Sequence, residues 1–463
     1  MSLLIPDAPT LFLNAHLIDG YGGEPVHNAA VLAEGGKITK VGKTTDFPES
    51  PNGNLRVLDL EGRTLMPGLI EGHFHISFWG VRELPDLDLK LPAERTTVYA
   101  VKNAELALRC GYTGVASAGA LHRIDVTIRD MVNEGVIPGP RMAASGRDIC
   151  ATSGMLDWNP SFWKLGMDGL AIFADGIDEV RRAVRQNIKE GCDVVKVYVT
   201  GEGLLRPNQP PEETMYSLEE MIVAVDEAHK RNRQIAAHVR GNDGVKLCVK
   251  AGFDVLEHAT YADDEAVEMI AEHKDTMFVV PGLGYHWGIL TKGIECGIPP
   301  DLMAATEYQE EWELGCVAMD KLRKAGVRVV PGGDYGFVWC PHGEYAKDIE
   351  LFVTDMGFSP MEAIVSATKH GAELLRLDYL CGTIEEGKCA DILVVNGNPL
   401  DDIVILQDRS KLDLVMKDGK VYVNNLGLPQ ELPAIQDFTM DIEKIQNAKA
   451  APPTMPTAAE VQH

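Results

Sequence analysis

Two histidines separated by one residue, His73 and His75, end a short apolar run with the sequence TLMPGLIEGHFHI. Alternate residues of a β-strand point to the same side, so both imidazoles would face one interior and Phe74 the other. Imidazoles are common ligands of divalent metal ions, and this pair could therefore bind one ion. An isolated pair of this kind is more often a polar strand end, so the interpretation requires partners elsewhere in the chain.

Further side chains that can bind metal or act as bases stand in or at the ends of later apolar runs. They are Lys196 in DVVKVYVTG, His238 in QIAAHV, His258 in DVLEHAT and Asp334 in VRVVPGGD. Taken singly, such a histidine is usually a hydrogen-bonded core residue, a lysine can extend to solvent, and an aspartate can cap a helix. Equivalent positions at several strand ends favour one shared site.

The elements that must position these residues alternate between residues 66 and 380. Short apolar runs are followed by charged segments of helical period, such as VYAVKNAELALRC, IDEVRRAVRQNIKEG, SLEEMIVAVDEAHKRN, DGVKLCVKAG and DEAVEMIAEH. With the histidine strand, the apolar runs YTGVASAG, RMAASGR, DVVKVYVTG, RQIAAHV, FDVLEHAT, MFVVPGL and VRVVPGGD complete a set of eight. This pattern predicts an α/β fold with a (β/α)8 TIM barrel, whose catalytic residues lie at the C-terminal ends of the strands.

The two ends of the chain read differently from its middle. Residues 1–65 and 381–427 show short alternating strands with Gly, Asn and Pro at the breaks, which predicts one small β-sandwich built from both termini. Residues 428–463 are rich in Ala, Pro and Gln and are expected to form a C-terminal arm or tail. The irregular stretch 150–170, with Trp158 and Trp163, is predicted to be a loop over the barrel mouth.

Composition narrows the class of protein. A formal net charge of −26 argues against nucleic acid and anionic membranes as partners. The nine cysteines form no CxxC pair, which favours free thiols in a reducing cytoplasm over disulfides or a thiolate zinc site. The N-terminus shows no signal peptide and no apolar run is long enough to span a membrane, so a cytoplasmic location is expected.

Lys196 has the most specific chemistry of the set. An ammonium group inside a barrel mouth beside metal ions would be disfavoured, and burial lowers the pKa of a lysine and makes it a nucleophile. Addition of carbon dioxide would convert it to a carbamate, an anion with two oxygens that can bridge two cations. A water bridging two such ions is acidified toward hydroxide near neutral pH.

These residues and their surroundings resemble the amidohydrolase superfamily over nearly the whole chain. The resemblance rests on PGLIEGHFH, the lysine strand, the two single histidines, PGGD and GTIEEGKCADILVVNGNPL. It implies two divalent metal ions, zinc in the first place with cobalt or manganese as alternatives. By that likeness the metal ligands are His73, His75, Asp334, His238, His258 and an N6-carboxylated, bridging Lys196. The bridging hydroxide would attack the substrate, Asp334 would act as general base, and Tyr216 in TMYSLEE would polarise the scissile carbonyl.

Within the superfamily the chain resembles the branch of metal-dependent dipeptidases, ochratoxin-type amidases, and phenylurea and molinate hydrolases. The stretch DYGFVWCPHG is most similar to the phenylurea and molinate hydrolases. Met155 stands where the dipeptidases have a carboxylate-binding histidine, and Val239-Arg240 replaces their Ala-Tyr. Both departures disfavour dipeptides, although Arg240 could bind an acid differently. His73 stands where some urea and thiocarbamate hydrolases carry asparagine, which favours two metals over one.

The sequence therefore predicts hydrolysis of an amide, urea or carbamate-type C–N bond, or a thiocarbamate C–S bond, in a small molecule. The alternatives are a dipeptidase or N-acyl amino acid hydrolase, a deaminase, which the bridging lysine disfavours, and a non-catalytic scaffold, which the complete ligand set disfavours. A homo-oligomer is expected from the resemblance. Candidates for the substrate pocket are Arg240, His286, Trp339 and His342, with Trp287 nearby and Asp348 as a residue that could orient one of them.

Overall fold

The structure is a computed structural model that describes residues 9–47, 55–159, 169–202, 209–304 and 307–427. Elements and contacts below refer to these residues. None of the described helices is both long and apolar enough to cross a membrane. Residues 428–463 and Trp163 lie outside the described residues, so the predictions of a C-terminal tail and of a loop around Trp163 are not tested.

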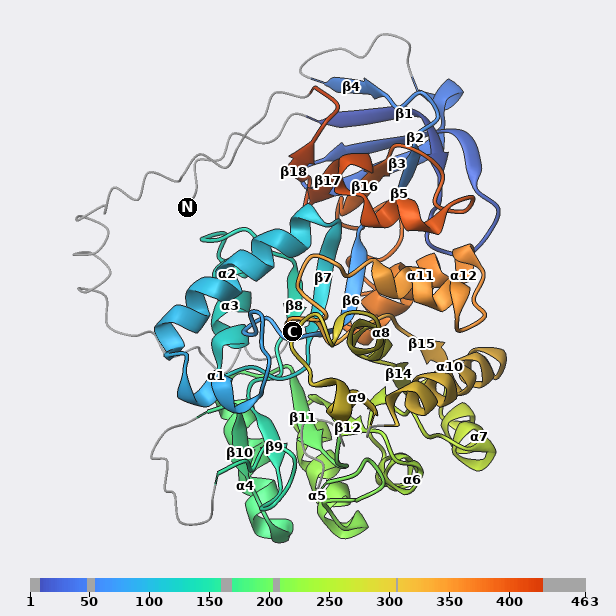
Figure 1. The fold of residues 1–463 in the computed structure, drawn as a ribbon. Helices are drawn as coiled ribbons and strands as arrows, with labels where there is room; N and C mark the ends of the chain where they lie inside the picture. The colour runs from blue at the N-terminus through green and yellow to red at the C-terminus, as the bar shows by residue number, and fades with distance from the viewer. Residues whose placement is uncertain (1–8, 48–54, 160–168, 203–208, 305–306, 428–463) are drawn as a thin grey trace, which may run out of the picture. The chain divides into compact units, whose positions relative to one another are not determined.

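The apolar runs of the middle region form parallel strands at the predicted places. They are β6 (Leu69–Phe74), β7 (Tyr112–Ser117), β8 (Arg141–Ala143), β11 (Val194–Tyr198), β12 (Gln234–Val239), β13 (Val255–His258), β14 (Phe278–Val280) and β15 (Arg328–Val329). The first three pair in the order β6-β7-β8. The others pair as β9-β11-β12-β13-β14-β15, where β9 is Asp148–Cys150, with β10 (Ala171–Phe173) at the outer edge. All of these pairs are parallel, and Figure 1 shows them flanked by helices.

Backbone hydrogen bonds connect the two parallel sheets at both edges. The third predicted strand is interrupted: β8 ends at Ala143, and β9 (Asp148–Cys150) continues after a short break. Ala144 O, in that break, accepts bonds from the N–H groups of Asp193 (2.7 Å) and Val194 (3.1 Å). At the other edge, the N–H of Gly72 donates to Pro331 O at 2.7 Å. A (β/α)8 barrel requires this connectivity.

The five segments of helical period are helices, and local sequence explains their ends. They are α2 (Ala93–Arg109), α4 (Gly176–Glu190), α5 (Leu218–His229), α6 (Asn242–Ala251) and α7 (Asp264–Glu272). Helix α5 begins with a capping box, in which Ser217 accepts a bond from the N–H of Glu220 and the Glu220 carboxylate bonds back to Ser217. Helix α4 ends at Gly191, whose φ of 102° lies in the left-handed region that glycine adopts without strain.

The remaining elements of the middle region were not predicted individually. The helices are α1 (Pro85–Leu89), α3 (Ile124–Asn133), α8 (Leu283–Lys292), α9 (Pro300–Ala304), α10 (Tyr308–Lys324), α11 (Lys347–Thr354), α12 (Pro360–Val365) and α13 (Gly371–Leu374). Strand β10 (Ala171–Phe173) pairs in parallel with β9, so regular structure borders the stretch that was expected to be a loop. Short helical turns lie at 44–46, 366–370, 403–407 and 409–411.

The two ends of the chain share one sheet, as predicted. Its strands are β1 (Thr10–Leu17), β2 (Val26–Glu34), β3 (Lys37–Lys43), β4 (Arg56–Asp59), β5 (Thr64–Pro67), β16 (Ile392–Val395), β17 (Leu412–Lys417) and β18 (Lys420–Asn424). They pair in the order β18-β17-β16-β5-β1-β2-β3, with β4 beside β1, and blue and red strands meet in Figure 1. The hydrogen bonding makes this one continuous sheet, and its packing as a sandwich stays a prediction.

A partly buried ion-pair cluster ties the parallel strands to this terminal sheet. Arg141, at the start of β8, donates to both carboxylate oxygens of Asp391 at 3.0 and 3.1 Å. The same guanidinium also pairs with Asp418, in the turn between β17 and β18. Asp391 in turn accepts a bond from the N–H of Asp418 at 2.8 Å. We call Arg141, Asp391 and Asp418 the Arg141 cluster.

Candidate active site

Three of the predicted ligands converge at the ends of β6 and β15. His73 lies on β6, His75 follows it, and Asp334 follows β15. The Nε2 atoms of His73 and His75 are 3.2 Å apart, and Asp334 Oδ1 lies 2.9 Å from His75 Nε2 and 3.5 Å from His73 Nε2. All three side chains are buried, and their ligand atoms are close enough together to hold one metal ion.

His238 and His258 form a second convergent pair on the neighbouring strands β12 and β13. His238 Nδ1 lies 3.0 Å from His258 Nε2. The ring of His258 also lies 5.2 Å from the ring of His73, measured between centroids. The two groups of predicted ligands are therefore adjacent parts of one site.

Two of these ligands have a left-handed backbone, which is uncommon outside glycine. The φ angle is 80° at His258 and 63° at Asp334. Regular strand geometry would send Glu257 and His258 to opposite sides. The structure instead brings the ligand atoms of both, together with His73, within 4.8 Å of one another. We attribute this to the turn of the backbone at His258.

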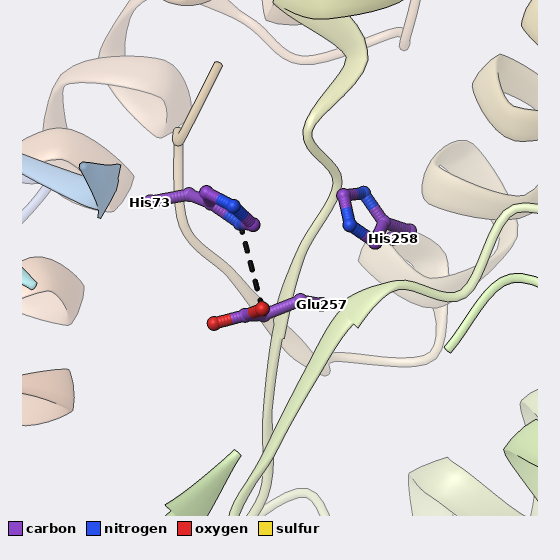
Figure 2. Close-up of side chains that lie close together, drawn as sticks. All are labelled: His73, Glu257 and His258. Atoms are coloured by element: carbon purple, nitrogen blue, oxygen red, sulfur yellow. Dashed lines mark ion pairs between the residues drawn. The ribbon is translucent and has the colours of Figure 1, made fainter. Parts of the chain in front are cut away.

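Glu257 is a candidate ligand that the sequence analysis missed. Its Oε2 lies 3.7 Å from His73 Nδ1, and Figure 2 shows this ion pair as a dashed line, with His258 on the neighbouring side of His73. The same oxygen contacts the amino group of Lys196. The signal was present in the run DVLEHAT, where Glu257 is an acidic residue inside a buried strand and shares the alternation of Val255.

Burial sets the charge of the basic groups. It lowers the pKa of Lys196 to about 8, against the opposing effects of Asp148 and Asp334. It also lowers the pKa of His73 to about 3 and that of His238 to about 4, so both imidazoles are neutral at pH 7. Burial alone would raise the pKa of Asp334, but His73 and His75 hold it well below its ordinary value. Neutral imidazoles beside an ionised carboxylate are the protonation states that metal binding requires.

Hydrogen bonds orient the imidazoles for this task. His75 Nδ1 donates to Gly119 O at 3.0 Å, which leaves its Nε2 facing His73 and Asp334. His238 Nε2 lies 3.2 Å from Glu202 Oε2, which leaves its Nδ1 facing His258. A carboxylate or carbonyl behind a metal-binding histidine selects its tautomer and fixes its ring. The donor set therefore fits two metal ions. Sequence analysis missed Glu202 because the surrounding TGEG reads as an ordinary turn.

Arg240 lies beside His238 and is held by two carboxylates. Its Nε and Nη2 bond to Glu202 at 3.2 and 2.9 Å, and its Nη1 bonds to Glu311 at 3.2 Å. His286 Nε2 is 3.2 Å from both Arg240 Nη1 and Glu311 Oε1. Arg240 and His286 are completely buried. We call Arg240, Glu202, Glu311 and His286 the Arg240 cluster.

A small cavity of about 10 Å³ opens onto the ligands. The residues that line it are His75, Phe78, Leu84, Met155, Tyr198, Glu202, His238, Tyr285, Asp334 and Phe337. Met155 thus lies at the cavity, as its place in the sequence suggested. Aromatic and aliphatic side chains form most of the remaining wall.

The predicted pocket residues lie behind this lining. Arg240 and His286 belong to the Arg240 cluster, and Trp339 packs against the lining residue Phe337 with ring centroids 5.5 Å apart. The hydroxyl of Tyr216 donates to Ala174 O at 3.1 Å. For Tyr216 to polarise the scissile carbonyl, as predicted, its hydroxyl would have to break this hydrogen bond to Ala174.

His342 supports the turn that carries His75. Its Nε2 donates to the carbonyl oxygens of His75 (3.2 Å) and Phe78 (3.1 Å), and its Nδ1 accepts from the hydroxyl of Tyr345 at 3.1 Å. Burial lowers the pKa of His342 to about 3, which matches this neutral tautomer. His342 therefore contacts the backbone of the site, and its side chain is not part of the cavity lining among the described residues.

Asp348 belongs to a buried acidic pair near the backbone that leads to Asp334. Burial raises its pKa to about 8, and burial, together with the neighbouring Asp348, raises the pKa of Glu71 well above its ordinary value. Glu71 Oε1 accepts a bond from the N–H of Gly333 at 2.8 Å, directly before Asp334. The acidic pair thus helps to position the Asp334 backbone.

Comparison with known proteins identifies the family of this chain. The model of the amidohydrolase family matches residues 64–422. This chain belongs to the amidohydrolase family. The match includes every predicted metal ligand, from His73 to Asp334, and extends from β5 of the terminal sheet into β18.

Individual relatives place the chain within the predicted branch. Ochratoxinase from Aspergillus niger is 31% identical over 448 residues, covering 90% of this chain and 87% of ochratoxinase. The structure of a Xaa-Pro dipeptidase is 28% identical with a TM-score of 0.79, covering 90% of this chain and 100% of that one. Molinate hydrolase shares the fold, with a TM-score of 0.73, 22% identity, and coverage of 92% and 97%. Identity is thus higher to the ochratoxinase and dipeptidase than to molinate hydrolase.

Proposed function

We propose that this protein is a metal-dependent hydrolase of small molecules that cleaves a C–N bond of an amide, urea or carbamate, or a thiocarbamate C–S bond. The observation that carries the proposal is the convergence of His73, His75 and Asp334 beside the His238–His258 pair, at a cavity. Family membership independently supports an amidohydrolase. A (β/α)8 barrel is part of the proposal, supported by the hydrogen bonds that join the two sheets.

The residues present fit two divalent ions. His73, His75 and Asp334 would hold one ion, His238 and His258 the other, and Lys196, as a carbamate, would bridge them. When bound, such ions acidify a water and polarise the carbonyl of the substrate. A pKa of about 8 leaves part of Lys196 as the neutral amine, which can attack carbon dioxide and lose a proton to give the carbamate. Glu257 must then release the amino group, and it remains beside His73 and His258 as a further oxygen donor.

Asp334 has the position of the general base. Its carboxylate faces the cavity and is held ionised by His73 and His75, so it can accept a proton from the attacking water. It can then pass that proton to the leaving nitrogen or sulfur. Phe78, Tyr198 and Phe337 would pack against the apolar part of the substrate.

Replacing Asp334 by asparagine tests the mechanism. We expect Asp334→Asn to lower kcat by about 100- to 10,000-fold, the usual contribution of a proton-transfer group of this kind. The variant should retain most of its metal, since four imidazoles remain. Turnover of an anilide and a phenylurea is measured beside the metal content per chain. Undiminished kcat with full metal occupancy would refute the role of Asp334.

A dipeptidase or N-acyl amino acid hydrolase is the second candidate. It is favoured by the identity to the Xaa-Pro dipeptidase over nearly the whole chain. A panel of dipeptides assayed beside anilides and phenylureas separates the two functions. Faster turnover of dipeptides would replace the first proposal. A cytoplasmic location and a homo-oligomeric state stay predictions of the sequence.

A further inference from the structure

Arg240 is a fully buried cation beside the cavity-lining residues Glu202 and His238, and its hydrogen-bonding groups are already engaged. A guanidinium binds carboxylates through paired N–H groups, so a free Arg240 would be a natural receptor for an acidic substrate. In the structure both of the N–H groups that form such a pair, on Nε and Nη2, bond to Glu202. The third nitrogen, Nη1, bonds to Glu311, and the whole side chain is buried.

Glu202 stands between Arg240 and the cavity. It is part of the cavity lining, and Arg240 is not. Both carboxylate oxygens of Glu202 accept bonds from Arg240, and Oε2 also lies 3.2 Å from His238 Nε2. The cavity therefore meets the carboxylate side of the ion pair, and among the described lining residues none is Lys or Arg.

We infer that the substrate is a neutral aryl- or alkyl-substituted amide, urea or carbamate without a carboxylate beside the scissile bond. The inference rests on the proposed function and specifies its substrate class. Aromatic rings line the wall, among them Phe78, Tyr198, Tyr285 and Phe337. Such a wall accommodates neutral apolar groups and offers a substrate carboxylate no free cationic side chain.

A substrate carboxylate could reach Arg240 only by displacing Glu202. That exchange would leave Glu202 buried without its cation and would also weaken its bond to His238. Leaving one partner of a buried charged pair uncompensated corresponds to at least about 30-fold in affinity. We therefore expect at least this ratio between two ligands that differ only in charge at this position.

A matched pair of compounds tests this expectation without requiring turnover. N-benzoylphenylglycine and its primary carboxamide have nearly the same shape and differ in charge. In their ketone analogues a CH2 replaces the scissile NH, so that these analogues bind and are not cleaved. Binding of both analogues to the metal-loaded wild-type protein is measured by calorimetry, and hydrolysis of both parent compounds is measured in parallel.

We expect the carboxamide analogue to bind at least about 30-fold more tightly than the carboxylate. Glu202→Gln should reduce that ratio at least about tenfold, because Arg240 then lacks one of its compensating charges. Glu227→Gln is the matched control. Glu227 also holds an arginine through both oxygens, Arg185 at 2.7 and 3.2 Å, and it does not line the cavity. This control should leave the ratio unchanged.

Equal or tighter binding of the carboxylate by the wild-type protein overturns the inference. A lack of measurable binding of the carboxamide overturns it as well. A ratio that survives in Glu202→Gln shows that Glu202 is not its cause and also overturns it. Failure of the proposed function has a different result, in which no amide, urea or carbamate is hydrolysed by metal-loaded protein whatever the binding ratio.

Discussion

The Arg141 cluster and the Arg240 cluster solve the same electrostatic problem in two regions of the molecule. In each, a largely buried guanidinium is neutralised by two carboxylates, one of which it binds through both oxygens. Besides its arginine, Asp391 accepts a hydrogen bond from the backbone N–H of Asp418. Besides its arginine, Glu202 contacts His238, and it also lines the cavity.

The group that each carboxylate contacts besides its arginine decides whether the cluster affects stability alone or function as well. A carboxylate that bonds only to its arginine and to the backbone can affect little besides folding. A carboxylate that also orients a candidate metal ligand connects folding with metal affinity and substrate choice. Two ion pairs of nearly the same geometry should therefore respond differently to substitution.

Removing Arg141 should give the largest effect on stability. Arg141→Ala leaves Asp391, whose side chain is 2% exposed, without its cation. We expect the free energy of unfolding to fall by about 3–5 kcal/mol, as when other buried ion pairs lose one partner. Urea unfolding measures the loss. The kcat/KM of the protein that remains folded should match the wild type, and a selective loss of activity would break the contrast between the two clusters.

Glu202→Gln should act mainly on the metal site. The amide can still accept a bond from His238 but lacks the charge that favours the metal-binding tautomer. We expect metal affinity to fall by about 10–100-fold, as when other groups behind a metal ligand are replaced. Competition with a chromophoric chelator measures this constant. Unchanged affinity would mean that the Arg240 cluster is as purely structural as the Arg141 cluster.

The pH dependence of the free energy of unfolding tests whether neutral His342 stabilises the turn that carries His75. Its pKa is about 3 in the folded protein and near 6.5 when unfolded, so between these values the unfolded chain binds a proton that the folded one does not. Stability from this residue is therefore complete above pH 6.5 and is lost as the pH falls toward 3, by at most about 1.4 kcal/mol per pH unit. His342→Gln should make the decline between pH 6 and 4 shallower. Unfolding curves at pH 7, 6, 5 and 4 measure it, and equal slopes in both proteins would contradict it.

Glu227→Gln should give the smallest effect. Its partner Arg185 is 54% exposed, and solvent screens pairs of this kind. We expect the free energy of unfolding to change by about 1 kcal/mol or less, with no change in metal affinity. The same urea and chelator measurements apply. A loss as large as that of Arg141→Ala would show that burial does not explain the ranking.

The sequence predicted the parts of this molecule that depend on local pattern. The alternation of apolar runs located the parallel strands, and the rule for barrel strand ends brought His73, His238 and Asp334 into one site. Helical periodicity, another local pattern, located α4 and α5. In each case the information lies within a few neighbouring residues.

What the sequence did not reveal depends on contacts between distant segments. Glu202 and Glu311 are separated by more than a hundred residues, and only the fold brings both to Arg240. The left-handed backbone at His258 accompanies the approach of Glu257. The residue type does not predict this conformation, because only a minority of histidines adopt it. Strands β9 and β10, of three residues each, are too short for alternation to be visible.

The shared sheet of the two chain ends has a consequence for biosynthesis. Strand β5 pairs with β16, so Pro67 has no strand partner until the ribosome has translated the intervening segment and Ile392. During that time the edge of β5 is open to wrong partners, because unpaired strand edges promote association between chains. A ribosome that stops before Ile392 would release a product with its metal ligands present and this edge exposed. We expect such a product to aggregate.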